Sequence, residues 1–164
     1  MDKKETRFKE IYETNYPKVI RLCLGYVNGD TQKAADIAQE VFIKTWENLE
    51  NFREDSKVST WIYRIAVNTC LLQIRKDKKT AKKYPLHRLV EAPVEVNEIE
   101  KENMLNGLYA CITMLSETNK AIIMLELEGL PQKEIAKVMG LQHEAIRTRI
   151  HRIKNKLIKC VNHE

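Results

Sequence analysis

The sequence is poor in the residues that interrupt regular secondary structure. Of its 164 residues, 5 are glycine and 4 are proline, about half the usual share of each. Long stretches are instead rich in Leu, Ile, Ala, Glu, Lys and Arg, which are common in helices. This composition argues against a β-sandwich or a barrel, and we predict an all-α fold.

The sequence also lacks an apolar run near the roughly 20 residues that a helix needs to cross a bilayer. Its N-terminus, Met1 to Lys9, is charged and has no apolar core of the kind found in signal peptides. We therefore expect a cytoplasmic protein without membrane insertion.

Spacings typical of metal or catalytic sites are absent as well. No Cys-x-x-Cys pair occurs, and no histidine stands at metal-ligand spacing from the dispersed cysteines Cys23, Cys70, Cys111 and Cys160. There is no phosphate-cradling glycine-rich loop, His-Glu-x-x-His motif or nucleophile elbow. We expect reduced thiols, no metal site, no cofactor and no enzymatic activity.

The chain carries more positive than negative charge. The 28 lysines and arginines outnumber the 23 aspartates and glutamates, for a net charge of +5, which favours a polyanionic partner without proving one. A basic run from Arg75 to Lys83 gives way to two prolines and an acidic stretch. Because the charge changes sign there and periodicity fades, we predict two small helical domains, 5–78 and 100–164, joined by a flexible linker over 79–99.

The first predicted domain contains two helices with clear apolar faces. Asp30 or Thr31 can cap a helix with an inward stripe, and Ser59 or Thr60 can cap a later one. The first stripe comprises Ile37, Ala38, Val41, Phe42, Thr45 and Leu49, and the second helix should bury Ile62, Ile65, Ala66 and Leu72.

The second domain contains the clearest local pattern. A short helix after Pro131 ends at Gly140-Leu141, and a second helix follows at once. Its apolar stripe is Ile146, Ile150, Ile153 and Leu157, and its opposite face carries His143, Glu144, Arg147, Thr148 and His151. This spacing is typical of a helix-turn-helix, whose second helix enters the major groove of DNA. A helical hairpin with a solvated basic face is the plainer alternative.

A resemblance to a known family covers nearly the whole chain. The run from Asp36 to Trp46 (Asp-Ile-Ala-Gln-Glu-Val-Phe-Ile-Lys-Thr-Trp) resembles the Asp-x-x-Gln-Glu-x-Phe-x-x-x-Trp pattern of region 2 of sigma factors. Phe52-Arg53 and the segment from Ser59 to Asn68 are similar to the rest of that region. Residues from Leu115 to Arg152 resemble region 4. The chain is identified as resembling the extracytoplasmic-function (ECF) subfamily of the sigma-70-type RNA polymerase sigma factors.

The resemblance implies partners and sites. The partners are core RNA polymerase, promoter DNA and an anti-sigma factor. Core polymerase would contact Asp36, Gln39 and Glu40, although solvated carboxylates on a surface helix are the plainer interpretation. The minus-10 strand would contact Phe52, Trp61, Tyr63, Arg64, Asn68, Arg75 and Lys76. Phe52 and Trp61 are equally explained as core residues.

The minus-35 duplex would be read by the second helix of the helix-turn-helix. The residues assigned to it are Gln142, His143, Glu144, Arg147, Thr148, Arg149, His151 and Arg152, of which Arg147 suits bidentate contact with guanine. The chain departs from the family pattern at Leu72, Ser116, Lys120 and Pro131 and at the start of this helix, which leaves the promoter sequence open. The alternative function is a helix-turn-helix regulator that binds an operator.

Overall fold

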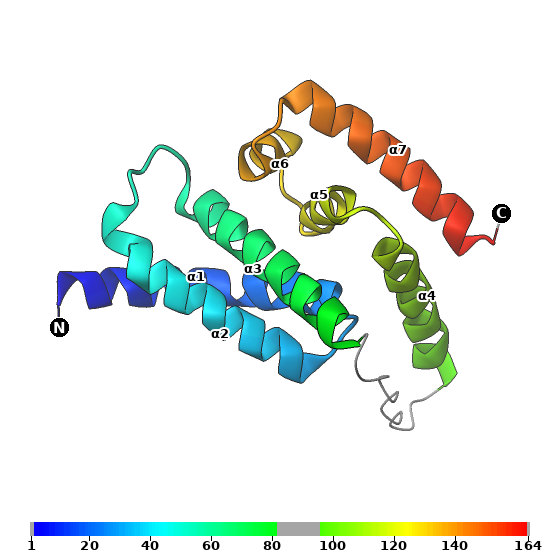
Figure 1. The fold of residues 1–164 in the computed structure, drawn as a ribbon, viewed down its shortest axis with the longest axis horizontal. Helices are drawn as coiled ribbons and strands as arrows, with labels where there is room; N and C mark the ends of the chain where they lie inside the picture. Colours follow the sequence, from blue (N-terminus) through cyan, green and yellow to red (C-terminus); the bar gives the residue numbers. More distant parts are fainter. Residues whose placement is uncertain (1, 82–95, 164) are drawn as a thin grey trace.

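The structure, a computed structural model, describes residues 2–81 and 96–163, and this part of the chain is almost entirely helical (Figure 1). The first unit comprises α1 (Lys3–Tyr26), α2 (Thr31–Asn48), the short 3-10 helix η1 (Leu49–Asn51) and α3 (Val58–Ala81). The second comprises α4 (Val96–Thr113), α5 (Glu117–Leu127), α6 (Gln132–Met139) and α7 (His143–Val161). The all-α prediction with two helical units is confirmed.

Several helix ends follow from local chemistry. The Asp30 carboxylate accepts a hydrogen bond from the Lys33 N–H at 3.1 Å, so Asp30 is the N-cap of α2. Ser116 caps α5 in the same way, with its hydroxyl accepting from the Asn119 N–H at 3.3 Å. The departure from the family pattern at Ser116 therefore supplies a helix cap.

The predictions for α3 need three corrections. The helix begins at Val58, so Ser59 and Thr60 lie inside it and do not cap it. Leu72 is 47% exposed because it lies one turn after the exposed Asn68, on the same face of the helix. The helix also continues to Ala81, into the segment predicted as linker. Most of that segment, 82–95, lies outside the described residues.

The predicted apolar stripes of α2 and α7 form cores. The six α2-stripe residues, from Ile37 to Leu49, are all buried between α1 and α3. The α7 stripe is likewise buried, against α4, α5 and α6. The two units also contact each other, since α3 packs on α6 and α1 packs on α5.

The expectation of four reduced cysteines was wrong. Cys111 of α4 and Cys160 of α7 form a disulfide, because packing of these helices brings their Cα atoms to 6.0 Å. Cys23 and Cys70 remain free thiols in the core of the first unit, with their Sγ atoms 3.8 Å apart.

Candidate functional site

The turn between α6 and α7 fixes the helix-turn-helix. Gly140 adopts a left-handed conformation with φ 66°, and the Leu141 N–H donates to the Ala136 carbonyl at 3.0 Å. Because the next helix begins at His143, the two helices are held at a fixed angle by a turn of three residues, Gly140 to Gln142. The stripe of α7 fixes which side of this helix faces outward.

The residues assigned to the minus-35 duplex lie on α7, except for Gln142, which is its N-cap. All eight, from Gln142 to Arg152, are exposed. Within the described part of the chain no hydrogen bond or ion pair holds the guanidinium of Arg147, whereas Arg149 donates to Asn119 at 3.5 Å. Lys154 pairs with Glu126 at 3.0 Å and ties α7 to α5. Arg147 is therefore better placed than Arg149 to reach a base edge.

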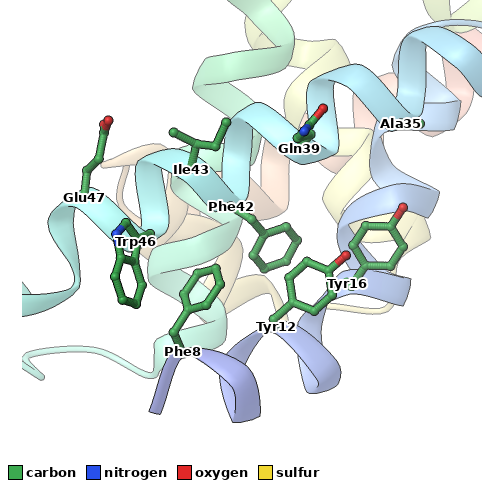
Figure 2. Close-up of a pocket in the computed structure, with 9 residues that line it drawn as sticks. All are labelled: Phe8, Tyr12, Tyr16, Ala35, Gln39, Phe42, Ile43, Trp46 and Glu47. Atoms are coloured by element: carbon green, nitrogen blue, oxygen red, sulfur yellow. The ribbon is translucent and has the colours of Figure 1, made fainter. Parts of the chain in front are cut away.

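A groove of about 520 Å³ lies between α1 and α2 on the first unit. Figure 2 shows rings from α1 facing rings from α2, with Gln39, Ile43 and Glu47 along the α2 side. The aromatic residues are Phe8, Tyr12, Tyr16, Phe42 and Trp46. Phe8 packs edge-on against Trp46 with centroids 5.2 Å apart, and Tyr12 packs against Phe42 at 4.8 Å. Such a groove suits the apolar face of a partner helix.

The residues assigned to core polymerase lie on or beside this groove. Gln39 is exposed and lines it, and Asp36 is exposed on the same helix. Glu40 is half-buried and pairs with Lys44 at 3.1 Å.

The α1 wall of the groove was missed from sequence. Phe8, Tyr12 and Tyr16 are spaced four residues apart and therefore share one helical face. Tyr12 is 39% exposed, so this face of α1 reaches the surface as well as packing against the core. The aromatic spacing in α1 was the signal that could have predicted the groove.

The aromatic residues assigned to the minus-10 strand divide into two groups. Phe52 and Trp61 are half-buried and stack on one another, with centroids 4.6 Å apart. Tyr63 is 5% exposed, and burial, followed by the charge of Glu128, raises the pKa of Tyr63 to about 12. Tyr63 thus lies beneath the second unit rather than on a free surface.

The polar residues assigned to the same strand share one exposed face of α3: they are Arg64, Asn68, Arg75 and Lys76. Arg64 and Arg75 contact the second unit. The guanidinium of Arg64 donates to the Lys137 carbonyl of α6, and Arg75 binds the Glu117 carboxylate of α5 at 2.6 Å. This bond raises the pKa of Arg75 and lowers the pKa of Glu117.

Neither a metal cluster nor a membrane helix emerges from the described residues. No group of three or more His, Cys, Asp or Glu side chains in 2–81 and 96–163 could hold a metal ion. No helix in these ranges is both long and apolar enough to span a bilayer.

Comparisons with known proteins agree on one family. The chain matches Sigma-70 region 2 over residues 11–80 and Sigma-70, region 4 over residues 105–157. It is 30% identical to the ECF RNA polymerase sigma factor SigW of Bacillus subtilis, over 93% of this chain and 87% of that protein. It is 34% identical to the ECF RNA polymerase sigma-E factor of Escherichia coli, over 84% of this chain and 77% of that protein.

A solved structure shares the fold. The sigma factor RpoE of Bartonella quintana, crystallised with the anti-sigma factor NepR, superposes with a TM-score of 0.74 at 20% identity, over 95% of this chain and 97% of that one.

Proposed function

The chain belongs to the ECF subfamily of sigma-70 factors, and we propose that it divides the work of promoter recognition between its two units. It is an alternative sigma factor, which binds core RNA polymerase and directs promoter-specific initiation. In this proposal, region 4 (100–164) reads the minus-35 duplex, and region 2 (5–78) binds polymerase and holds the minus-10 strand. The segment 79–99 links them.

The observation that carries the proposal is the outer face of α7. It presents seven exposed residues on the second helix of a helix-turn-helix, preceded by the exposed N-cap Gln142, with Arg147 unpaired within the described residues. A helix of this kind can enter the major groove and place a guanidinium against the O6 and N7 atoms of guanine. Exposed Lys156 and Arg152 can then hold phosphates on the flanks.

Core polymerase is the proposed occupant of the α1–α2 groove. The rings offer apolar contact area, while Gln39, Asp36 and Glu40 supply an amide and two acidic groups beside it. A partner helix with apolar residues on one side and basic residues along the edge would match this surface. The proposed surface combines apolar and polar contacts. This combination explains why α2, which carries acidic side chains, also carries the exposed apolar residue Ile43.

The minus-10 strand is proposed to follow the exposed face of α3. Stacked Phe52 and Trp61 offer an aromatic surface for an unpaired base, and the arginines further along the helix can hold the backbone. An anti-sigma factor is the proposed regulator, by analogy with the relative crystallised with NepR. Because its proposed partner is polymerase, the protein is proposed to act in the cytoplasm. In this proposal the chain supplies no catalytic residues.

Run-off transcription tests the proposal directly. Core polymerase is supplied with a pool of the host's own promoter fragments, with and without this protein. We expect new transcripts that depend on the protein and that share two promoter elements. Absence of such transcripts, from core that responds to another sigma factor, would favour an operator-binding regulator instead.

A further inference from the structure

A pocket of about 300 Å³ lies where the two units meet. The first unit contributes the end of α1, the start of α2 and the second half of α3, and the second unit contributes the end of α4 and the first half of α5. No residue assigned to polymerase or to DNA lines this pocket. Its volume is at the lower end of the range found for small-molecule sites.

The two helices α1 and α5 approach closely beside this pocket. Met124 of α5 lies against Gly25 of α1, where an added Cβ atom would collide with the Met124 Cε. Lys120 lies one turn before Met124 on α5, and Tyr26 directly follows Gly25 on α1. The close approach of the helices therefore carries the Lys120 side chain into the space between the units.

Lys120 is buried without an anionic partner. It is only 7% exposed, and within 2–81 and 96–163 its ammonium forms no hydrogen bond or ion pair. The Tyr26 ring, with its centroid 5.3 Å away, attracts the charge but does not replace the hydrogen bonds that an ammonium makes with water. Burial, followed by the positive charge of Lys78, lowers the pKa of Lys120. An anion beside this group would be stabilised.

The acidic side chains that line the pocket are already bound to other cations. Glu117 accepts hydrogen bonds from Arg75, the shortest at 2.6 Å, and Asp77 pairs with Lys33 at 3.6 Å. Lys78 also lines the pocket and forms no ion pair in the described part of the chain. Positive charge therefore exceeds negative charge around this space.

Part of the lining is apolar. Leu71 and Ile74 of α3 and Leu115, just before α5, are partly buried and line the same space. Apolar side chains with a few polar groups beside them are typical of small-molecule sites. A ligand with an acidic group and a short apolar part would meet both kinds of surface.

We propose that this pocket binds a small organic anion. Its carboxylate or phosphate group pairs with Lys120 and Lys78, since ammonium groups bind both kinds of acid. Its apolar part packs against Leu71, Ile74 and Leu115. The site goes beyond the proposed function, because it gives the chain a small-molecule ligand of its own. The walls come from both units, so binding stabilises the contact between them.

The test is isothermal titration calorimetry of the full chain with phenyl phosphate and with benzoate. Inorganic phosphate supplies the charge without the apolar part, and benzyl alcohol supplies the apolar part without the charge. Lys120→Met removes the ammonium at similar side-chain length, and Lys159→Met makes the same change at an exposed position in the last turn of α7. Lys78→Gln is a second variant, at an exposed position where folding should not be disturbed.

We expect the wild-type chain and Lys159→Met to bind at least one of the two organic acids with a Kd of about 1 mM or tighter. Inorganic phosphate and benzyl alcohol should bind roughly tenfold more weakly. Lys120→Met should weaken binding of the organic acid roughly tenfold or more, because a charge-assisted hydrogen bond is lost. Lys78→Gln should weaken it roughly twofold to fivefold, since an exposed charge contributes less.

Circular dichroism and the radius of gyration from small-angle X-ray scattering check that the variants keep their helices and that the two units stay together. If Lys120→Met fails this check, Lys78→Gln decides the matter by itself. Wild-type affinity in both variants would place the anion elsewhere on this basic chain and overturn the proposal, as would the absence of binding by either organic acid.

Equal affinity for inorganic phosphate and phenyl phosphate would overturn the organic ligand. None of these outcomes bears on the proposed function, because neither polymerase nor promoter DNA is present in the titration.

Discussion

Arg147 is the residue whose proposed contact with the minus-35 duplex gives the sharpest prediction. It is exposed on α7 and has no partner within the described part of the chain. We expect Arg147→Ala to cost about 1–3 kcal/mol of discrimination at one base pair of the minus-35 element, which lowers promoter use roughly fivefold to 150-fold. Co-elution with core polymerase should be unchanged.

Lys159→Ala is the matched control for that substitution, since Lys159 is exposed in the last turn of the same helix and has no assigned contact. Run-off transcription from one identified promoter compares the two variants with the wild-type chain. Equal promoter use by Arg147→Ala and Lys159→Ala would show that Arg147 does not contact the bases of the minus-35 element.

Glu40 tests the polymerase surface. Glu40→Lys places a second ammonium beside Lys44, which now pairs with Glu40 at 3.1 Å, and reverses the charge next to the groove. We expect weaker association with core polymerase, measured by co-elution, because like charges across an interface are unfavourable. Glu13→Lys on α1 is the control for net charge. Unchanged co-elution of the Glu40 variant would count against the assignment.

Turn geometry gives a prediction for a single element. Gly140 has φ 66° and no atom within 4 Å of an added Cβ, so Gly140→Ala should cost about 1–2 kcal/mol through backbone strain alone. Gly107 lies inside α4 with equally open surroundings, so Gly107→Ala should instead stabilise region 4 by about 1 kcal/mol.

The two tryptophans allow the units to be followed separately in this experiment. Trp46 and Trp61 both lie in the first unit, so fluorescence reports region 2, and far-ultraviolet circular dichroism reports the helices of both. In urea, the Gly140 and Gly107 variants should shift the dichroism transition in opposite directions and leave the fluorescence transition unchanged. Shifts of the same sign would show that backbone conformation is not the cause.

The helices and some of their ends, such as the Asp30 cap and the Gly140 turn, were predictable from the sequence. The start of α3 and the pairing of residues far apart in the chain were not. The stripes of α2 and α7 were both predicted correctly because each follows one face of a single helix. Thr60 illustrates the limit. Its hydroxyl suits a cap by local rules, but it donates to Glu134, which is 74 residues away along the chain. The disulfide between Cys111 and Cys160 was equally hidden, since it depends on how α4 packs against α7.

The same limit applies to the site as a whole. Motif positions predicted that Gln39 and the outer face of α7 are exposed, because one helix determines each of them. The full groove needs α1 beside α2, and the contacts of α3 with α6 need the second unit to fold against the first. Contacts between units depend on single polar pairs such as Arg75 with Glu117, which leave no periodic trace in the sequence.

At the scale of the molecule, Glu117, Glu128 and Glu134 of the second unit bond to the first unit and make the contact between the units sensitive to acid. Their bonds lower the pKa of Glu117 and of Glu134, so their contribution is complete above the ordinary glutamate pKa of about 4.3. It is lost as pH falls through the lowered values. Cationic side chains face both carboxylates: Arg75 and Lys78 face Glu117, and Lys57 and Lys137 face Glu134.

The radius of gyration should therefore stay constant from neutral pH to about pH 5 and increase below the ordinary glutamate pKa of about 4.3. Circular dichroism at each pH separates opening of the two units from loss of helix. The Glu117→Gln/Glu128→Gln/Glu134→Gln variant is the control, because its amide side chains cannot titrate, and its two units should be apart at every pH. A wild-type chain that stays compact in acid with its helices intact would mean that the apolar contact at Gly25 and Met124 closes the molecule without the carboxylates.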